Sequence, residues 1–161
     1  MSTPGKNLSS YDPSLIPPAG NLKIAIVVSE WNDQVTGQLA RGAQETLIKH
    51  GVNPSNLLIK QVPGSFELPL AARMLIESNP LDAVILIGCV IRGETPHFDF
   101  ISQAVAHGCM QLGLDTGIPV IFGVLTTNNL DQALDRAGGK HGNKGTEAAV
   151  TAIKMASFNR S

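Results

Sequence analysis

The chain has 161 residues, of which 43% are hydrophobic and 16% are charged, and its formal net charge is −1. This length suits one compact domain, and the near-neutral charge argues against nucleic acids or anionic membranes as partners, because both attract strongly basic proteins. No apolar run is long enough to span a bilayer, and the first residues lack the pattern of an export signal. We therefore expect a cytoplasmic protein, and its low charge favours a homo-oligomer that hides surface between copies.

Residues 1–21 are rich in proline, serine and glycine and show no periodicity. Such a segment cannot fold alone, so we expect an N-terminal arm that is either flexible or ordered by a neighbouring subunit. The folded domain is expected to span residues 22–161.

The rest of the chain alternates between two kinds of pattern. Apolar, β-branched runs predict strands over residues 23–29, 57–62, 83–91 and 118–125. Helical periodicity predicts a helix capped by Asn32 or Asp33, a second over 66–78, a third with the stripe Phe98, Ile101, Val105 and Leu112, and two more over 130–137 and 144–158. This order predicts an α/β fold: a single-domain three-layer sandwich whose four-stranded parallel, flavodoxin-like sheet lies between helices, and to which the arm could add a strand.

Ligands of such sheets bind at the carboxyl ends of the strands, so the segments that follow each strand form the candidate site. Trp31 follows the first strand, and its ring can either stack on a flat heterocycle or simply cover the sheet edge. Ser65 follows the second strand and can cap the next helix. Glu67 can accept hydrogen bonds from a polyol, although the helix dipole favours a carboxylate there in any protein.

The segment after the third strand is the most informative. Gly93, Glu94 and Thr95 lead directly into a helix, where free N–H groups and a threonine hydroxyl form an anion site suited to phosphate. His97 follows in the first helical turn and can transfer protons near neutral pH. A lone histidine at such a position is more often an ordinary surface residue, but its place beside an anion site favours a catalytic role.

The last part of the chain carries weaker signals. Arg136 lies near a helix end, where it either complements the helix dipole or clamps a phosphate. The glycine-rich stretch 138–146 follows no strand and has no Ser or Thr after a Gly-Lys pair, so it is not a phosphate-binding loop and is predicted to be a tight hinge between helices. Cys89 and Cys109 are expected to be reduced core residues, and the four histidines show no metal-ligand spacing.

Four segments together resemble one enzyme family: PGSFELP (63–69), GCVIRGETPHFDF (88–100), FGVLTT (122–127) and RAGGKHGNKG (136–145). In this order, and over nearly the whole chain from residue 22 onward, they are similar to the 6,7-dimethyl-8-ribityllumazine synthases. The resemblance implies condensation of 5-amino-6-(D-ribitylamino)uracil with 3,4-dihydroxy-2-butanone 4-phosphate, with release of phosphate and water, in riboflavin biosynthesis. It implies no metal and no organic cofactor.

The resemblance also implies a role for each matching residue. His97 corresponds to the residue that transfers protons. The substrate-binding residues implied are Trp31, Ser65, Phe66, Glu67, Cys89, Val90, Ile91, Phe122 and Lys144, and the phosphate-binding residues are Gly93, Glu94, Thr95 and Arg136. Phe122 and Arg136 match residues that an adjacent subunit contributes. Trp31 stands where many members carry phenylalanine, which widens the stacking surface.

The resemblance further implies a pentamer with an active site shared between adjacent subunits. Some members stack pentamers into decamers or sixty-subunit shells, and the compact hinge favours such a shell, with riboflavin synthase as a candidate partner. Pro17 and Pro18 in the arm could instead hinder contacts between pentamers.

Two other functions suit the predicted sheet. A flavodoxin-like flavin-binding protein would need a phosphate loop after the first strand, and residues 29–32 are poor in Gly, Ser and Thr. A cage that stores ligand without turnover is the other alternative.

Overall fold

A computed structural model describes residue 7 and residues 9–158. Its centre is a parallel sheet of four strands, with the order β2-β1-β3-β4. The strands are β1 (Ile24–Ser29), β2 (Leu57–Val62), β3 (Ala83–Ile91) and β4 (Val120–Thr127). β3 pairs with both β1 and β4, and its side chains are buried on both faces of the sheet, which explains why its sequence is apolar almost throughout.

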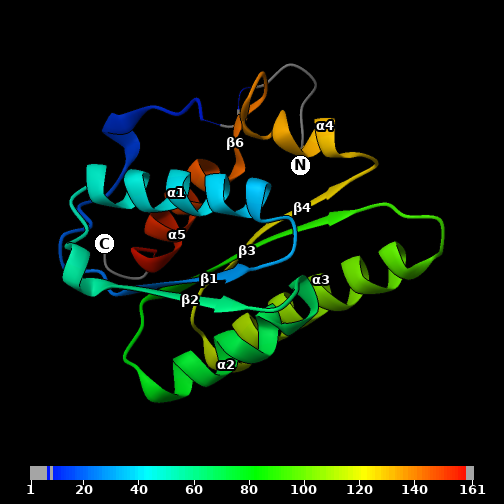
Figure 1. The fold of residues 1–161 in the computed structure, drawn as a ribbon. Coiled ribbons are helices and arrows are strands. Elements are labelled where there is room, and N and C mark those ends of the chain that lie inside the picture. The colour runs from blue at the N-terminus through cyan, green and yellow to red at the C-terminus, as the bar shows by residue number, and fades with distance from the viewer. Residues whose placement is uncertain (1–6, 8, 159–161) are drawn as a thin grey trace.

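Helices cover both faces of this sheet (Figure 1). One face carries α1 (Asp33–Lys49) and α5 (Lys144–Ala156), and the other carries α2 (Leu68–Ser78) and α3 (His97–Thr116). The short helix α4 (Leu130–Leu134) follows β4, and single turns of 3-10 helix lie at η1 (Pro13–Leu15), η2 (Pro54–Asn56) and η3 (Ser65–Glu67). The predicted three-layer α/β fold is therefore confirmed.

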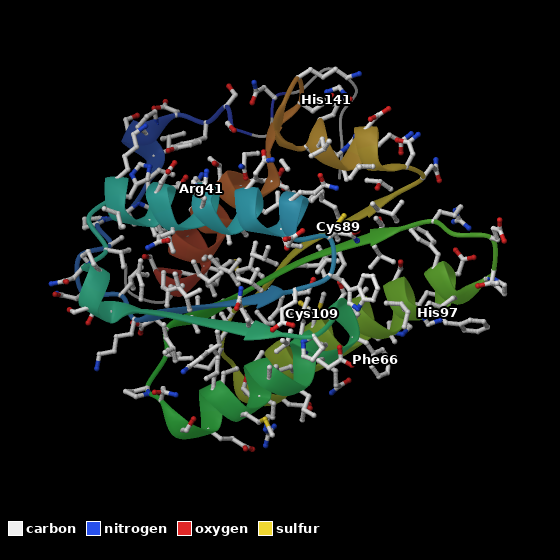
Figure 2. The ribbon with its side chains drawn as sticks, in the orientation of Figure 1. Arg41, Phe66, Cys89, His97, Cys109 and His141 are labelled. Carbon is white, nitrogen blue, oxygen red and sulfur yellow. The ribbon has the colours of Figure 1, made fainter. Side chains whose placement is uncertain are left out.

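Side chains alternate along the strands and fill two separate cores. In β1, Ile24 and Ile26 point into the core beneath α1 and α5, whereas Ala25 and Val27 point into the core beneath α2 and α3. Cys89 belongs to the first core and Cys109 to the second, and both thiols are free (Figure 2). The prediction that both cysteines lie in the core is confirmed.

The helix α1 has the predicted amphipathic stripe but not the predicted cap. Its inward residues Val35, Leu39, Ala43 and Leu47 are fully buried, and Gly51 follows the helix with a φ of +94°. Asn32 occupies the N-cap position, but its side chain makes no capping hydrogen bond and turns instead toward β3. The expected cap is therefore wrong in its chemistry, because the side-chain amide of Asn32 has another partner.

Further elements differ from the predictions in their bounds. The segment predicted as a helix over 66–78 starts with the 3-10 turn η3 and becomes α-helical only at Leu68. β4 begins after Pro119 and ends at Thr127, because its last residues continue the pairing with β3 as far as Ile91. α4 ends at Leu134, three residues before the predicted end.

The glycine-rich stretch is a small antiparallel hairpin and not the predicted hinge. Its strands are β5 (Ala137–Gly139) and β6 (Gly142–Asn143). Gly138 and Gly142 adopt φ values of +116° and +79°, which residues with a side chain rarely reach. The glycines therefore reverse the chain into a hairpin instead of simply linking two helices.

The hairpin leads into a close contact between α1 and α5. Asn143 caps α5, since its Oδ1 accepts hydrogen bonds from the N–H groups of Gly145 and Thr146. Its Nδ2 also donates to the carbonyl of Gln38 in α1, at 3.0 Å. One side chain thus starts α5 and fixes it against α1.

The described part of the arm packs on its own chain. The Tyr11 hydroxyl lies 2.9 Å from Nε2 of His50 at the end of α1, and Ser9 Oγ accepts a hydrogen bond from the N–H of Asn143. Ala19 is buried in the core beneath α1 and α5, and Ile16 packs against that core. Among the described residues, no helix is long and apolar enough to cross a membrane.

Candidate active site

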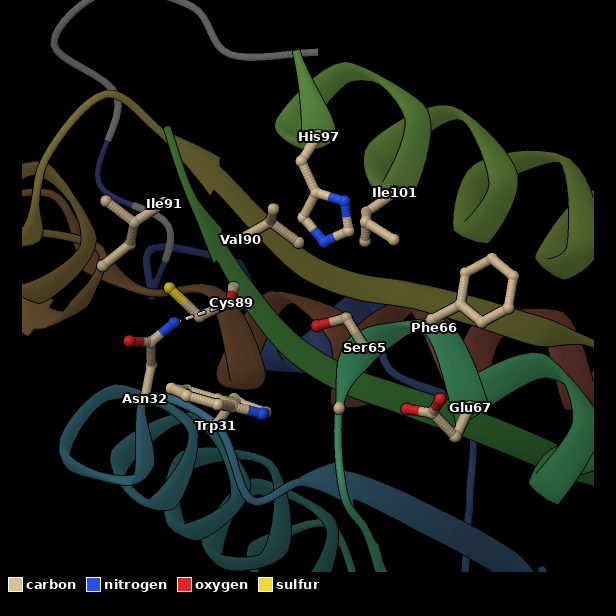
Figure 3. A pocket seen from close by; sticks show the side chains of 11 residues that line it. Trp31, Asn32, Ser65, Phe66, Glu67, Cys89, Val90, Ile91, His97 and Ile101 are labelled. Atoms are coloured by element: carbon tan, nitrogen blue, oxygen red, sulfur yellow. Dashed lines mark hydrogen bonds between the residues drawn. The ribbon is translucent and has the colours of Figure 1, made fainter. Parts of the chain in front are cut away.

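A cavity of about 550 Å³ opens at the carboxyl ends of β1, β2 and β3 (Figure 3). This is the place that the strand-end rule predicts for a ligand. The cavity is lined by Trp31, Asn32, Gly64, Ser65, Phe66, Glu67, Cys89, Val90, Ile91, His97 and Ile101.

The loop after β1 places Trp31 at the cavity. The Trp31 N–H donates to the carbonyl of Pro63, and the Trp31 carbonyl accepts a hydrogen bond from Ser29 Oγ. Trp31, the only tryptophan of the chain, is 73% exposed. A large ring held by its backbone and left open to solvent is suited to stack on a flat ligand.

Asn32 joins the loop after β1 to the end of β3. Its backbone is left-handed, with a φ of 60°, a conformation that asparagine tolerates better than most residues. Its Nδ2 donates to the carbonyl of Cys89 at 2.9 Å. The paired residues of β1 and β3 end at Val28 and Ile87, so this amide supplies a partner for a strand carbonyl beyond the end of the ladder.

The loop after β2 forms a second wall of the cavity. A Cβ on Gly64 would come within 3.0 Å of Glu67 Oε2 and 3.5 Å of Trp31 Cδ1, so glycine lets the backbone approach both side chains. Ser65 is buried and Glu67 is exposed. Gly88 of β3 leaves room for this wall, because a Cβ there would come within 2.6 Å of Ser65 Oγ.

His97 stands on the opposite side of the cavity as the first residue of α3. Its imidazole extends toward Val90 and Ile101 (Figure 3). Ile101 lies one helical turn after His97 and therefore shares its face of α3. An imidazole beside an apolar surface, with solvent access, can both orient a ligand and exchange protons with it.

The loop between β3 and α3 is exposed throughout, over residues 92–96. Within the part of the chain that the structure describes, the N–H groups of Gly93, Glu94 and Thr95 have no hydrogen-bond partner. Such free amides at the start of a long helix suit an anion. These three residues do not line the cavity themselves but lie on the segment that leads from its floor to His97.

Comparison with known proteins identifies the family. The sequence model of 6,7-dimethyl-8-ribityllumazine synthase matches residues 21–160. The chain belongs to this family. Proteins named 6,7-dimethyl-8-ribityllumazine synthase are 55% identical to it in Porphyromonas gingivalis and 54% identical in Parabacteroides distasonis, with 99% of both chains covered in each case. One from Flavobacterium johnsoniae is 54% identical, over 97% of this chain and 82% of the relative.

Three residues that the lumazine synthase resemblance assigns to the site lie away from the cavity. Phe122 lies within β4 opposite Leu86 and packs against the core beneath α2 and α3. Arg136 follows α4, and its Nη1 donates to the carbonyl of Gln132 at 2.9 Å. Lys144 begins α5. Its Nζ lies 2.6 Å from Glu147 Oε1. A single chain of this lumazine synthase family member therefore does not bring these three side chains to the cavity.

The remaining predicted substrate-binding residues and His97 all line the cavity, together with three residues that sequence reasoning missed. Asn32 was interpreted only as a helix cap, although an asparagine at a strand end is also a candidate for a left-handed turn. Ile101 was assigned to the helical stripe, and its spacing of four residues from His97 was the signal of a shared face. Gly64 appears in the sequence only within the segment PGSFELP, where a glycine indicates a turn and not a cavity wall.

The protonation of Cys89 and the arrangement of potential metal ligands bear on the chemistry of the cavity. Burial raises the pKa of the Cys89 thiol to about 11, so the thiol stays protonated at neutral pH and acts as a small apolar group. Within the described ranges, no cluster of three or more His, Cys, Asp or Glu side chains could hold a metal ion.

Proposed function

We propose that the protein condenses 5-amino-6-(D-ribitylamino)uracil with 3,4-dihydroxy-2-butanone 4-phosphate to 6,7-dimethyl-8-ribityllumazine, releasing phosphate and water. The observation that carries this proposal is the cavity at the strand ends, which combines an open indole, a carboxylate and an imidazole in a chain of the lumazine synthase family. The reaction is a late step of riboflavin biosynthesis. The relatives bear the name of this enzyme over nearly their full length.

The cavity suits the pyrimidine substrate. The ring would stack on Trp31, while its polar edge would meet the backbone of Cys89, Val90 and Ile91 at the end of β3. The ribityl chain would extend along Ser65, Phe66 and Glu67, where the carboxylate can accept hydrogen bonds from hydroxyl groups.

The substrate itself supplies the nucleophile, because its amine attacks the ketone carbon of the second substrate. His97 would take up and return protons as the imine forms, as phosphate leaves and as the ring closes. General acid–base catalysis of this kind contributes on the order of 10²-fold or more. Holding both substrates in one pocket contributes further, since it replaces a bimolecular encounter by a reaction within the complex.

The phosphate group would bind the free amides of the loop after β3, at Gly93, Glu94 and Thr95. Arg136 would complete this site from an adjacent subunit, as would Phe122, with Lys144 near the same site. The separation of these three residues from the cavity of their own chain supports a shared site. We therefore propose a homo-oligomer built of pentamers that assemble into a sixty-subunit shell, with riboflavin synthase as a candidate partner.

The outer faces of α2 and α3 support such an assembly. Five large apolar side chains on these helices are at least 60% exposed: Leu70, Met74, Phe100, Met110 and Leu114. Apolar surface of this extent is typical of protein interfaces. The free, buried cysteines also support a reducing compartment such as the cytoplasm.

Neither alternative function gains support. The loop after β1 carries Trp31 and Asn32 and has no glycine-rich phosphate site, as a flavodoxin-like protein would need. The relatives are named as synthases, which favours turnover over storage.

The deciding experiment mixes the pure protein with both substrates and records the absorbance and fluorescence of the product, while light scattering gives the particle size. Lack of product would refute the proposed function.

His97→Ala and Arg136→Ala are expected to reduce turnover at low butanone phosphate, by about 10²-fold for the histidine. Arg41→Ala is the matched control, because Arg41 is an exposed arginine of α1, outside the cavity and away from the outer faces of α2 and α3. Wild-type rates in both variants would refute the residue assignments alone.

A further inference from the structure

The short loop between β3 and α3 is held by an ion pair that no sequence motif predicted. Arg92, the first residue after β3, pairs with Asp99 in the first turn of α3. Nη2 of Arg92 lies 3.0 Å from Oδ1 of Asp99, and Nη1 lies 3.4 Å from Oδ2, so both carboxylate oxygens are engaged. The pair therefore joins the two ends of the loop that carries Gly93, Glu94 and Thr95.

Two further contacts reinforce this closure. The guanidinium carbon of Arg92 lies 4.1 Å from the ring centroid of Phe98, a cation–π distance. The Arg92 N–H donates to the carbonyl of Thr127 at 2.8 Å, which fixes the start of the loop to the end of β4. The side chain of Arg92 is thus held by a ring and a carboxylate, and both belong to α3.

The Arg92–Asp99 ion pair contacts α3 on the side away from the cavity. Successive residues of an α-helix are turned by about 100°, so Asp99 is about 200° from His97, whereas Ile101 is only about 40° from it. His97 and Ile101 line the cavity, and Arg92 and Asp99 do not. The ion pair can therefore set the rotation and height of the first helical turn without touching a ligand in the cavity.

From this geometry we propose that Arg92 and Asp99 are a positioning pair, which holds His97 and the loop amides in register for the phosphate-bearing substrate. The proposal rests on the proposed function and deepens it. The pair is about half exposed, with 45% and 50% of the two side chains accessible, and such pairs contribute little to global stability. Its effect is instead local, because a displacement of about 1 Å in a reacting group can reduce a rate by on the order of 10²-fold.

The experiment measures KM for each substrate in Arg92→Gln, Asp99→Asn and the double variant. We expect each single variant to raise KM for the butanone phosphate about fivefold to tenfold, while KM for the pyrimidine changes less than about twofold, because only the loop and the first turn of α3 move. The double variant should be no worse than the poorer single variant, since both changes break the same interaction. Glu77→Gln is the control, because it breaks another exposed ion pair, Arg73–Glu77 in α2, at 2.6 Å.

The same variants distinguish a positioning pair from a direct phosphate ligand. If Arg92 bound the phosphate itself, Asp99→Asn would release its guanidinium and leave KM for the butanone phosphate unchanged or lower. That result, or independent effects that multiply in the double variant, would overturn the proposal.

A second measurement does not depend on turnover. Amide hydrogen exchange over residues 101–103, whose N–H groups bond within the first turns of α3, should be at least about threefold faster in both single variants than in the wild type or in Glu77→Gln. Unchanged exchange would overturn the positioning role even if the protein proved inactive with these substrates. A wild type without activity would refute only the proposed function.

Discussion

The close contact between α1 and α5 predicts how a larger side chain at Gly145 changes the stability of the protein. Gly145 lies in the first turn of α5, directly against the backbone of α1. A Cβ built there meets the carbonyl carbon of Leu39 at 2.7 Å and Oδ1 of Asn143 at 2.9 Å, and it meets the Leu39 carbonyl oxygen closer still. We predict that Gly145→Ala strongly destabilises the protein.

The magnitude follows from what would have to move. The contact with the Leu39 carbonyl carbon is about 0.7 Å short of an ordinary contact, which begins near 3.4 Å. The obstacle is helix backbone and the capping side chain of Asn143, so neither can rotate away. Overpacking of this kind destabilises by about 1–3 kcal/mol, and we expect the upper end. For a domain of this size, about 3 kcal/mol lowers Tm by about 6–12 °C.

The assay is thermal unfolding followed by circular dichroism, at one protein concentration because oligomers melt in a concentration-dependent way. Gly37→Ala is the matched control. Gly37 is an exposed glycine inside α1, and a Cβ there meets nothing within 4 Å. This control should be neutral or more stable by up to about 1 kcal/mol, because alanine favours helices. A Tm of Gly145→Ala within about 2 °C of the wild type would refute the reasoning.

Two further predictions concern the cavity and the cores. Trp31→Ala should raise KM for the pyrimidine about tenfold, whereas Trp31→Phe should stay within about threefold because a stacking ring remains. Ligand binding should quench the fluorescence of this single tryptophan, and equal KM values for both variants would contradict the stacking role. Burial raises the pKa of both the Cys89 and Cys109 thiols to about 11, which disfavours the reactive thiolate below that pH. Labelling by iodoacetamide should therefore be slow at pH 7 and accelerate about tenfold per pH unit up to about pH 11, and fast labelling of the folded protein at pH 7 would contradict it.

The sheet was predictable because its chemistry is local. A parallel strand covered on both faces must be apolar almost throughout, so β3 is visible in the sequence as an unbroken apolar run. The hairpin β5–β6 was not predictable in the same way. Its glycines indicate a chain reversal, but pairing over so few residues depends on Asn143 and on contacts with α1.

The candidate site was predictable to the extent that it follows from topology. The strand-end rule brings Trp31, Ser65 and His97 to one cavity although they lie far apart in the sequence. Asn32 was missed because its partner is a backbone carbonyl of β3, and a sequence shows no such pairing. The sequence left Arg136 between a helix-dipole role and a phosphate clamp, and only the family resemblance assigned it to the site. In the described part of one chain Arg136 does not line the cavity, so a second copy is needed to test its role.

The packing of the arm changes where a shortened version of this protein can safely begin. Ala19 and Leu22 are only 1% and 2% exposed, although regular structure of the sheet starts at Ile24. Removal of all residues before the first strand would leave a cavity in the core next to α1. Truncation of one buried leucine to alanine alone destabilises a protein by about 2–5 kcal/mol. Tags and fusion partners should accordingly be joined before Ser9, whose hydroxyl oxygen accepts a hydrogen bond from Asn143.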